Sequence, residues 1–170
     1  DCFEPVAERD TSEVMQQPFG RMLEALDDLK PGEVYLCSGA SPTYALWGEL
    51  MSTRALKLGA AGAVVNGYSR DTHGVVRAGL PVFSYGPYAQ DQNPRGKVID
   101  WRCPLRVGEV LIESGDLVIG DIDGVCIVPR AHESSVIQAA LEKARGERTV
   151  LKALQQGTSA TEAFEHYGIM

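Results

Sequence analysis

The sequence lacks the patterns that mark several common classes of protein. No apolar run approaches the ~20 residues needed to cross a bilayer, and no signal-peptide pattern is present. Lys and Arg together number 16 against 23 Asp and Glu, a formal net charge of -7. Non-specific nucleic-acid binding requires clustered cations that displace counterions, so this charge balance argues against it.

Cysteine is also scarce, and the cysteines are far apart in the sequence. The four cysteines are Cys2, Cys37, Cys103 and Cys126, and no two form a CxxC motif. We expect the last three to be buried, reduced thiols on strand-like segments, which predicts a cytoplasmic protein. No GxGxxG turn follows a predicted strand, which argues against a nucleotide-type cofactor loop and therefore against a methyltransferase.

The length of 170 residues, 44% of them hydrophobic, is typical of one globular domain. We predict an exposed polar arm over 1–17 and a single domain over 18–170. Because the first residue is Asp1 rather than Met, we expect the start of the full-length protein to be missing. The periodicity predicts helices over 18–29, 43–58 and 131–156, strands over 61–67, 80–86, 96–103 and 108–129, and a last helix capped by Ser159 and Glu162.

This order of elements predicts an α/β fold, a mixed sheet with flanking helices and a C-terminal helical tail. The small-apolar run "AGAVVNG" is typical of a strand covered on both faces. Asp123-Gly124 predicts a hairpin turn within the last strand region. The two closing helices are long relative to the core available to bury them, so we expect a closed homo-oligomer.

The most informative feature is the adjacent pair Arg70-Asp71, which directly follows the apolar run, with Glu49 twenty spacer residues upstream. Arg offers a planar fork for a carboxylate or enolate, and Asp offers hard oxygen ligands for Mg²⁺ or Mn²⁺. A third group, the Glu49 carboxylate, could move a proton. Together, a guanidinium, a bound metal ion and a proton-transferring carboxylate are suited to reactions that form an enolate from a 2-oxo acid. The alternative, that Arg70 and Asp71 each pair with other residues at a strand end, stays open.

The block "WGELMSTRALKLGAAGAVVNGYSRD … LPVFSYG … GEVLIESGDLVIGDIDGVCIVP" resembles the RraA-like family. That family includes the 4-hydroxy-4-methyl-2-oxoglutarate aldolases and the regulator of ribonuclease E activity. The resemblance runs from about residue 18 to the end. It implies a layered, swivelling β/β/α-type domain and a homotrimer or hexamer with active sites at subunit boundaries.

The resemblance also implies roles for individual residues. Gly48, Glu49, Leu50 and Met51 would bind the pyruvyl carboxylate through their backbone. Arg70 would hold the substrate and steady the enolate, Asp71 would ligate Mg²⁺ or Mn²⁺, and Glu49 would position the proton-transferring water. Catalytic members usually carry Asp at the position of Glu49, so this chain departs there by one methylene.

The resemblance leaves two functions open. One is a metal-dependent pyruvate aldolase, a lyase with oxaloacetate decarboxylation as a side activity. The other is a non-catalytic regulator that binds ribonuclease E or another protein. The presence of Glu49 and Asp71 favours the lyase. The cations Arg54, Lys57 and Arg95 are candidates for contacting a distal carboxylate of the substrate.

Overall fold

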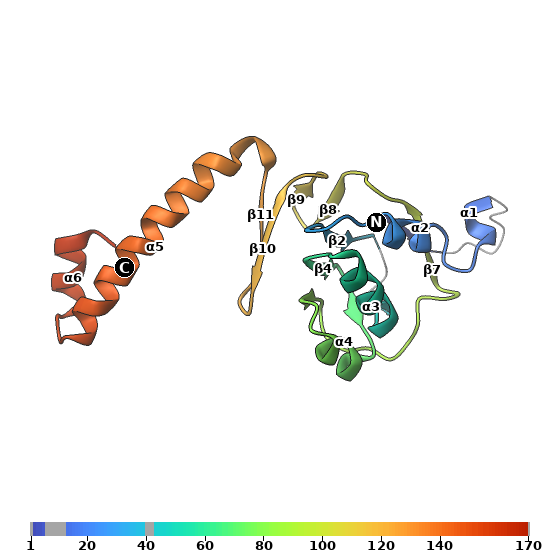
Figure 1. Cartoon of the computed structure of the whole chain (residues 1–170), viewed down its shortest axis with the longest axis horizontal. Coiled ribbons are helices and arrows are strands. Elements are labelled where there is room, and N and C mark those ends of the chain that lie inside the picture. The colour runs from blue at the N-terminus through green and yellow to red at the C-terminus, as the bar shows by residue number, and fades with distance from the viewer. Residues whose placement is uncertain (1, 6–12, 40–42, 170) are drawn as a thin grey trace. The chain divides into compact units, whose positions relative to one another are not determined.

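The computed structural model describes residues 2–5, 13–39 and 43–169. The chain divides into two compact units, Asp1–Ile127 and Val128–Met170. Figure 1 shows both, and each is described by itself below.

The first unit is built on a three-stranded parallel sheet. Its strands are β2 (Val34–Cys37), β4 (Gly62–Val65) and β6 (Val82–Phe83), in the order β2-β4-β6. Three of the four residues of β4 are buried, as expected for the apolar run that precedes the Arg-Asp pair. The strand predicted over 61–67 is therefore confirmed in a shorter form.

A second parallel pair carries the candidate site residues. Strand β3 (Ala45–Trp47) pairs with β5 (Tyr68–Ser69). Helix α3 (Glu49–Leu58) follows β3, and helix α4 (Thr72–Ala78) follows β5. The helix predicted over 43–58 is wrong in its first part, since all three residues of β3 are buried and extended. Pairing with β5 overrides the helical spacing of the apolar residues there.

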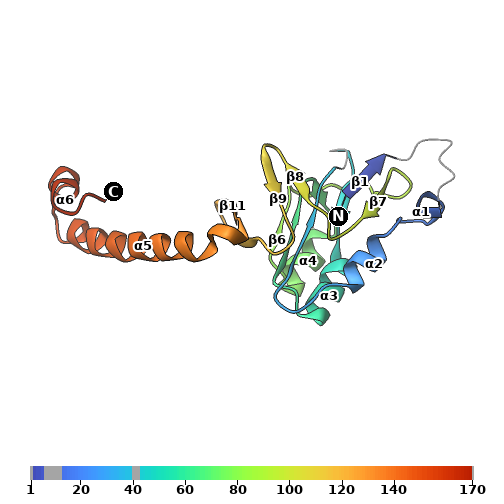
Figure 2. The same cartoon turned by 90° about the horizontal axis from the view of Figure 1, so that it is seen from above.

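Helix α2 (Met22–Asp27) is shorter than the helix predicted over 18–29. The preceding segment is held on strand β7 (Gly96–Asp100) instead, because the backbone N–H of Arg21 donates to the carbonyl of Val98 at 2.8 Å. Helix α3 contacts both α2 and α4, as Figure 2 shows from above. Their inner faces and the strands form one core, which includes Met22, Leu26, Tyr35, Tyr44, Leu46, Trp47, Ala55, Ala63 and Val98.

The segment predicted as an N-terminal arm contains a strand and a short helix. Strand β1 (Cys2–Pro5) pairs antiparallel with β7, and a short helix α1 spans Glu13–Gln16. Residues 6–12 lie outside the described residues. The arm is thus tied down in part by main-chain hydrogen bonds to a strand distant in sequence.

The remaining strands of the first unit are hairpins. Strand β8 (Leu105–Val107) pairs with β9 (Val110–Ile112), and β10 (Leu117–Asp121) pairs with β11 (Gly124–Val128). The turn at Asp123-Gly124 is confirmed. The prediction of three buried thiols is correct for Cys37 only, because Cys103 is half-buried and Cys126 on β11 is exposed.

The second unit holds a 3₁₀ turn (Arg130–His132), helix α5 (Glu133–Gln155) and helix α6 (Ala160–Tyr167). The predicted capping box is confirmed, with Ser159 and Glu162 bonding reciprocally. Large apolar side chains on both helices are exposed, among them Leu141, Leu151 and Phe164. Within the described ranges, no helix combines the length and apolarity required for a bilayer span.

Candidate functional site

The topology brings the two sequence segments of the candidate site together. Strands β3 and β5 run parallel, with Trp47 opposite Ser69, and each is followed directly by a helix. The backbone N–H of Arg70 donates to the carbonyl of Trp47 at 2.8 Å, which extends the ladder past the strand ends. Gly48-Glu49 and Arg70-Asp71 therefore leave the sheet side by side. The carboxyl ends of parallel strands are the usual place for ligand sites in α/β folds.

Gly48 is the point of closest approach between the two segments. A Cβ built on Gly48 would lie 2.7 Å from Asp71 Oδ2 and 3.5 Å from Arg70 Cγ. The backbone N–H of Glu49, in the first turn of α3, donates to Asp71 Oδ2 at 3.3 Å. The Asp71 carboxylate thus rests against the N-terminal end of α3, where partial positive charge favours an anion. A side chain at position 48 would therefore force the Asp71 carboxylate to move.

The backbone of Asp71 explains why its carboxylate turns toward α3. Asp71 has φ 56° and ψ 35°, in the left-handed region that residues other than glycine rarely adopt. It precedes α4, yet its side chain makes no capping hydrogen bond with that helix. The strained backbone therefore serves to aim the carboxylate across to the neighbouring helix rather than along its own.

Glu49 does not point at Arg70. Its Oε1 lies 3.2 Å from Nη2 of Arg77, which is in the last turn of α4. The carboxyl group lies over Gly74, where a Cβ would come within 2.2 Å of Glu49 Cδ. Neither Gly74 nor Arg77 was singled out from the sequence. Helix α4 itself was not predicted, so no spacing argument could have found them.

Arg70 is partly open to solvent. Its Nη2 lies 3.7 Å from Oδ2 of Asp91, and both side chains are about 40% exposed. An ion pair at this distance and exposure is weak, so the guanidinium remains able to exchange partners. Asp91 lies in the loop after β6 and was not singled out from the sequence either, since its place beside β3 depends on a bridge to Ala45.

Buried polar contacts fix the turn between β3 and α3. The indole Nε1–H of Trp47 donates to Ser52 Oγ at 2.7 Å, and that hydroxyl donates to the carbonyl of Gly48 at 3.1 Å. Trp47 and Ser52 are both almost fully buried. Of the other residues predicted to bind substrate by their backbone, Leu50 is 83% exposed and Met51 packs partly against the core.

Three tyrosines cluster at β5. One of them, Tyr68, lies on the strand two residues before Arg70, and the others are Tyr85 and Tyr88. The ring centroid of Tyr68 lies 5.8 Å from that of Tyr85 and 5.1 Å from that of Tyr88. Tyr85 and Tyr88 are exposed, and the backbone N–H of Tyr88 donates to the carbonyl of Ser69 at 2.8 Å. An aromatic surface therefore lies along the same strand as the guanidinium of Arg70.

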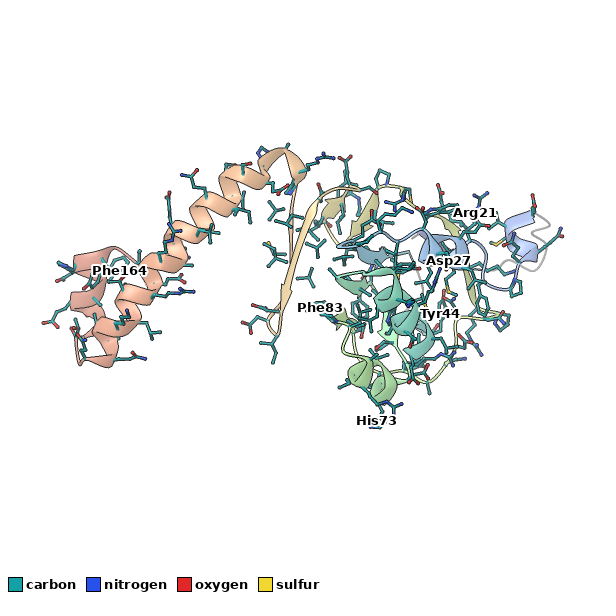
Figure 3. The ribbon with its side chains drawn as sticks, in the orientation of Figure 1. Arg21, Asp27, Tyr44, His73, Phe83 and Phe164 are labelled. Carbon is teal, nitrogen blue, oxygen red and sulfur yellow. The ribbon has the colours of Figure 1, made fainter. Side chains whose placement is uncertain are left out.

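The other residues considered from the sequence are engaged elsewhere or exposed. Arg54 donates to Asp27 at 2.7 Å, and Arg95 donates to the carbonyl of Asp91 at 2.9 Å. Figure 3 shows His73 at the outer surface of α4, where it is exposed. In the part of the chain that the structure describes, no three His, Cys, Asp or Glu side chains gather as a metal-binding group.

A separate cavity of about 550 Å³ lies in the first unit, lined by residues of α2, β2 and the segment 101–118. Its lining includes none of Glu49, Arg70 and Asp71. At its rim, Arg102 donates to Asp28 and, at 2.9 Å, to Glu33. Hydrogen bonds from Lys30 and then Arg102 hold the pKa of Asp28 well below its usual value, and the hydrogen bond from Arg102 lowers the pKa of Glu33.

Comparison with known proteins places these observations in a family. A family model described as Aldolase/RraA matches residues 8–127. A protein of Halalkalibacterium halodurans named "Putative 4-hydroxy-4-methyl-2-oxoglutarate aldolase" is 30% identical over 144 residues, which are 84% of this chain and 68% of that protein.

Two solved structures are similar over most of the chain. One, of an uncharacterized protein from Pseudomonas syringae pv. tomato, is 28% identical with a TM-score of 0.83, covering 89% of this chain and 71% of that one. The other is Streptomyces coelicolor RraAS2, titled an unusual member of the RNase ES inhibitor RraA protein family. It is 24% identical with a TM-score of 0.73, covering 86% and 70%, and supports the fold alone. This chain spans only part of the length of each relative.

Proposed function

Because the chain belongs to the Aldolase/RraA family, we propose that it is a divalent-metal-dependent carbon–carbon lyase that releases pyruvate from 4-hydroxy-2-oxo dicarboxylic acids. One observation carries the proposal. At the ends of two parallel strands, Asp71, with an exposed carboxylate, and Arg70, with a half-exposed guanidinium, both pack against Gly48 at the start of α3.

The Asp71 carboxylate fits a hydrated Mg²⁺ or Mn²⁺ ion. It is exposed, it is held in place through one oxygen by the N–H of Glu49, and no other protein carboxylate shares its position in the hydrogen bonds described. Mg²⁺ keeps several waters and often binds through one or two carboxylates, whereas zinc sites use three or four protein ligands. When bound, such an ion would stabilise negative charge on the 2-oxo group.

The chain's own residues would then carry out the reaction. The backbone N–H groups of Leu50 and Met51, in the first turn of α3, have no intrahelical acceptors and would bind the substrate carboxylate. Glu49 would position a water that removes the proton from the 4-hydroxyl group. The C3–C4 bond would break, with its electron pair forming the enolate of pyruvate beside Arg70. C4 would become the carbonyl carbon of the second product, and the proton taken up by the water would pass to C3 to complete pyruvate.

The same enolate would form if oxaloacetate lost CO₂, so decarboxylation is proposed as a side activity. The competing function is a regulator that binds ribonuclease E or another protein without chemistry. We further propose that a homotrimer or hexamer completes the site at subunit boundaries, as inferred from the family resemblance and the exposed apolar residues of α5 and α6.

The decisive assay measures pyruvate released from 4-hydroxy-4-methyl-2-oxoglutarate and from oxaloacetate, with and without Mg²⁺. Asp71→Ala and Arg70→Ala should each lower kcat at least 100-fold, because each removes a preorganised charge at the enolate. Asp27→Ala, which removes an exposed carboxylate on α2, is the matched control and should keep full rate. A wild type without turnover that retains ribonuclease E in a metal-independent pull-down would favour the regulator.

A further inference from the structure

Three residues at the start and along one face of helix α4 contact Glu49. Asp71, Gly74 and Arg77 follow one another at three-residue intervals, which places them along the same side of the helix. Each meets a different part of Glu49. Asp71 Oδ2 accepts from its backbone N–H at 3.3 Å, Gly74 lies under its carboxyl group, and Arg77 Nη2 lies 3.2 Å from its Oε1.

Gly74 is explained by the position of the Glu49 side chain, which passes over it. It is buried inside α4, where glycine is disfavoured relative to alanine, and its φ is not in the left-handed region. No feature of the backbone therefore calls for glycine. A Cβ there would lie 2.2 Å from Glu49 Cδ and 2.3 Å from Glu49 Oε2. The missing side chain makes room for the glutamate carboxyl group.

A glutamate needs this support more than an aspartate would. Its additional methylene adds one rotatable bond, and its side chain is 43% exposed, so packing alone does not hold the carboxylate. Arg77 supplies part of the missing constraint through one hydrogen bond, in which its Nη2 donates to Glu49 Oε1 at 3.2 Å. Arg70 does not contact Glu49 in the structure, and its guanidinium lies 3.7 Å from Asp91.

We infer that Arg77 is a positioning residue for Glu49, and that Gly74 leaves the space through which the Glu49 side chain reaches Arg77. This inference rests on the proposed function. Arg77 would act through the carboxylate of Glu49 and not on the substrate. Loss of Arg77 should therefore slow the chemical step and leave substrate binding unchanged.

Kinetics of Arg77 variants test the inference with 4-hydroxy-4-methyl-2-oxoglutarate and Mg²⁺, because this substrate carries the 4-hydroxyl group on which Glu49 would act. Arg77→Met should lower kcat about fivefold, the upper end for a partly exposed ion pair, with KM unchanged. Arg77→Lys, which keeps the charge, should recover part of the rate. Lys30→Met is the matched control, because it removes an exposed cation that is paired with Asp28 away from the proposed site, and it should leave kcat unchanged. A rise in KM at constant kcat would overturn the inference and make Arg77 a substrate ligand.

The Glu49→Asp background separates positioning from a general effect on α4. Aspartate is too short to reach Arg77, so Arg77→Met should have no further effect on kcat in that background. Gly74→Ala should lower kcat in the wild type by displacing Glu49. It should also lower kcat in the Glu49→Asp background, because its Cβ would lie 2.7 Å from the position of Glu49 Cγ, which becomes the aspartate carboxyl carbon. If the effects of Arg77→Met and Glu49→Asp instead multiply, the two side chains act independently and the inference is wrong.

The failure of the inference is distinguishable from that of the proposed function. An inactive wild type overturns the proposed function, and with it the catalytic role of Arg77. An active wild type whose kcat is unaffected by both Arg77→Met and Gly74→Ala overturns the inference alone. Thermal unfolding of each variant shows whether a lost rate reflects a lost fold.

Discussion

The backbone N–H of Glu49 donates to Oδ2 of Asp71 at 3.3 Å, although the two residues begin different helices. This contact joins the first turn of α3 to the residue that precedes α4. It makes the position of the Asp71 carboxylate depend on the backbone of α3. Changes to that turn should therefore reach the proposed metal site without altering any charged residue.

Gly48→Ala is the first such change. Its Cβ would lie 2.7 Å from Asp71 Oδ2, so the carboxylate must move. We expect at least a tenfold loss of Mg²⁺-dependent pyruvate release, in line with the sensitivity of catalysis to displacements of about 1 Å. Gly32→Ala is the control, because its Cβ meets no atom within 4 Å and only its positive φ is strained. Equal activity of the two variants would refute a close approach at Gly48.

Ser52→Ala tests the buried support of the same turn. It leaves the indole N–H of Trp47 without its partner at 2.7 Å and frees the carbonyl of Gly48 from a second bond. An unpaired buried donor typically costs about 1–3 kcal/mol, so the free energy of unfolding should fall by that amount. Urea unfolding followed by tryptophan fluorescence measures it. Thr53→Ala, which removes an exposed hydroxyl bonded to the carbonyl of Glu49, should cost much less.

The Arg102 cluster predicts a dependence of stability on pH. The pKa values of Asp28 and Glu33 are lowered in the folded protein from ordinary values of 3.8 and 4.5. Lowered carboxyl pKa values stabilise the fold above the unfolded values, and this stabilisation is lost as pH falls through the folded ones. Arg102→Met should therefore lower the urea midpoint at pH 7, by an amount that shrinks below about pH 4.5. A difference that is constant from pH 7 to pH 3 would contradict this reading.

Ser159→Ala tests the capping box of the second unit. Ser159 Oγ accepts from the N–H of Glu162 at 3.2 Å, and the Glu162 carboxylate accepts from the N–H of Ser159 at 3.1 Å. Loss of an N-cap of this type costs about 1 kcal/mol. Circular dichroism during thermal unfolding should show earlier loss of helix, while Ser135→Ala, within α5, should leave it nearly unchanged.

Local patterns in the sequence predicted the elements whose structure depends on nearby residues. The capping box at Ser159 and the turn at Asp123-Gly124 are set by bonds and dihedral angles within a few residues, and both are confirmed. The buried strand β4 follows from its continuous apolar run. By contrast, β3 has helical spacing in sequence and becomes a strand only because β5 lies beside it.

The same distinction between local pattern and tertiary contact applies to the residues of the candidate site. Glu49, Arg70 and Asp71 were recognisable from their residue types and spacing, because the twenty intervening residues span helix α3 and strand β4 and so lead from the end of one parallel strand to the end of the next. Their partners were not recognisable. Asp91 reaches Arg70 from a loop after β6, and Arg77 reaches Glu49 from a helix that the sequence did not predict.

The sequence by itself determined which chemical groups this protein can bring to a ligand: a guanidinium, two carboxylates and a glycine at the start of a helix. Only the tertiary structure decided the direction of each group. Residue type fixes charge and hydrogen-bonding capacity, whereas direction depends on parallel pairing of β3 with β5 and on the left-handed backbone of Asp71. Because of those two features, the Asp71 carboxylate contacts the first turn of α3 and the Glu49 carboxylate contacts Arg77 of α4. These contacts arise because the strand ends that carry the two segments are neighbours in space.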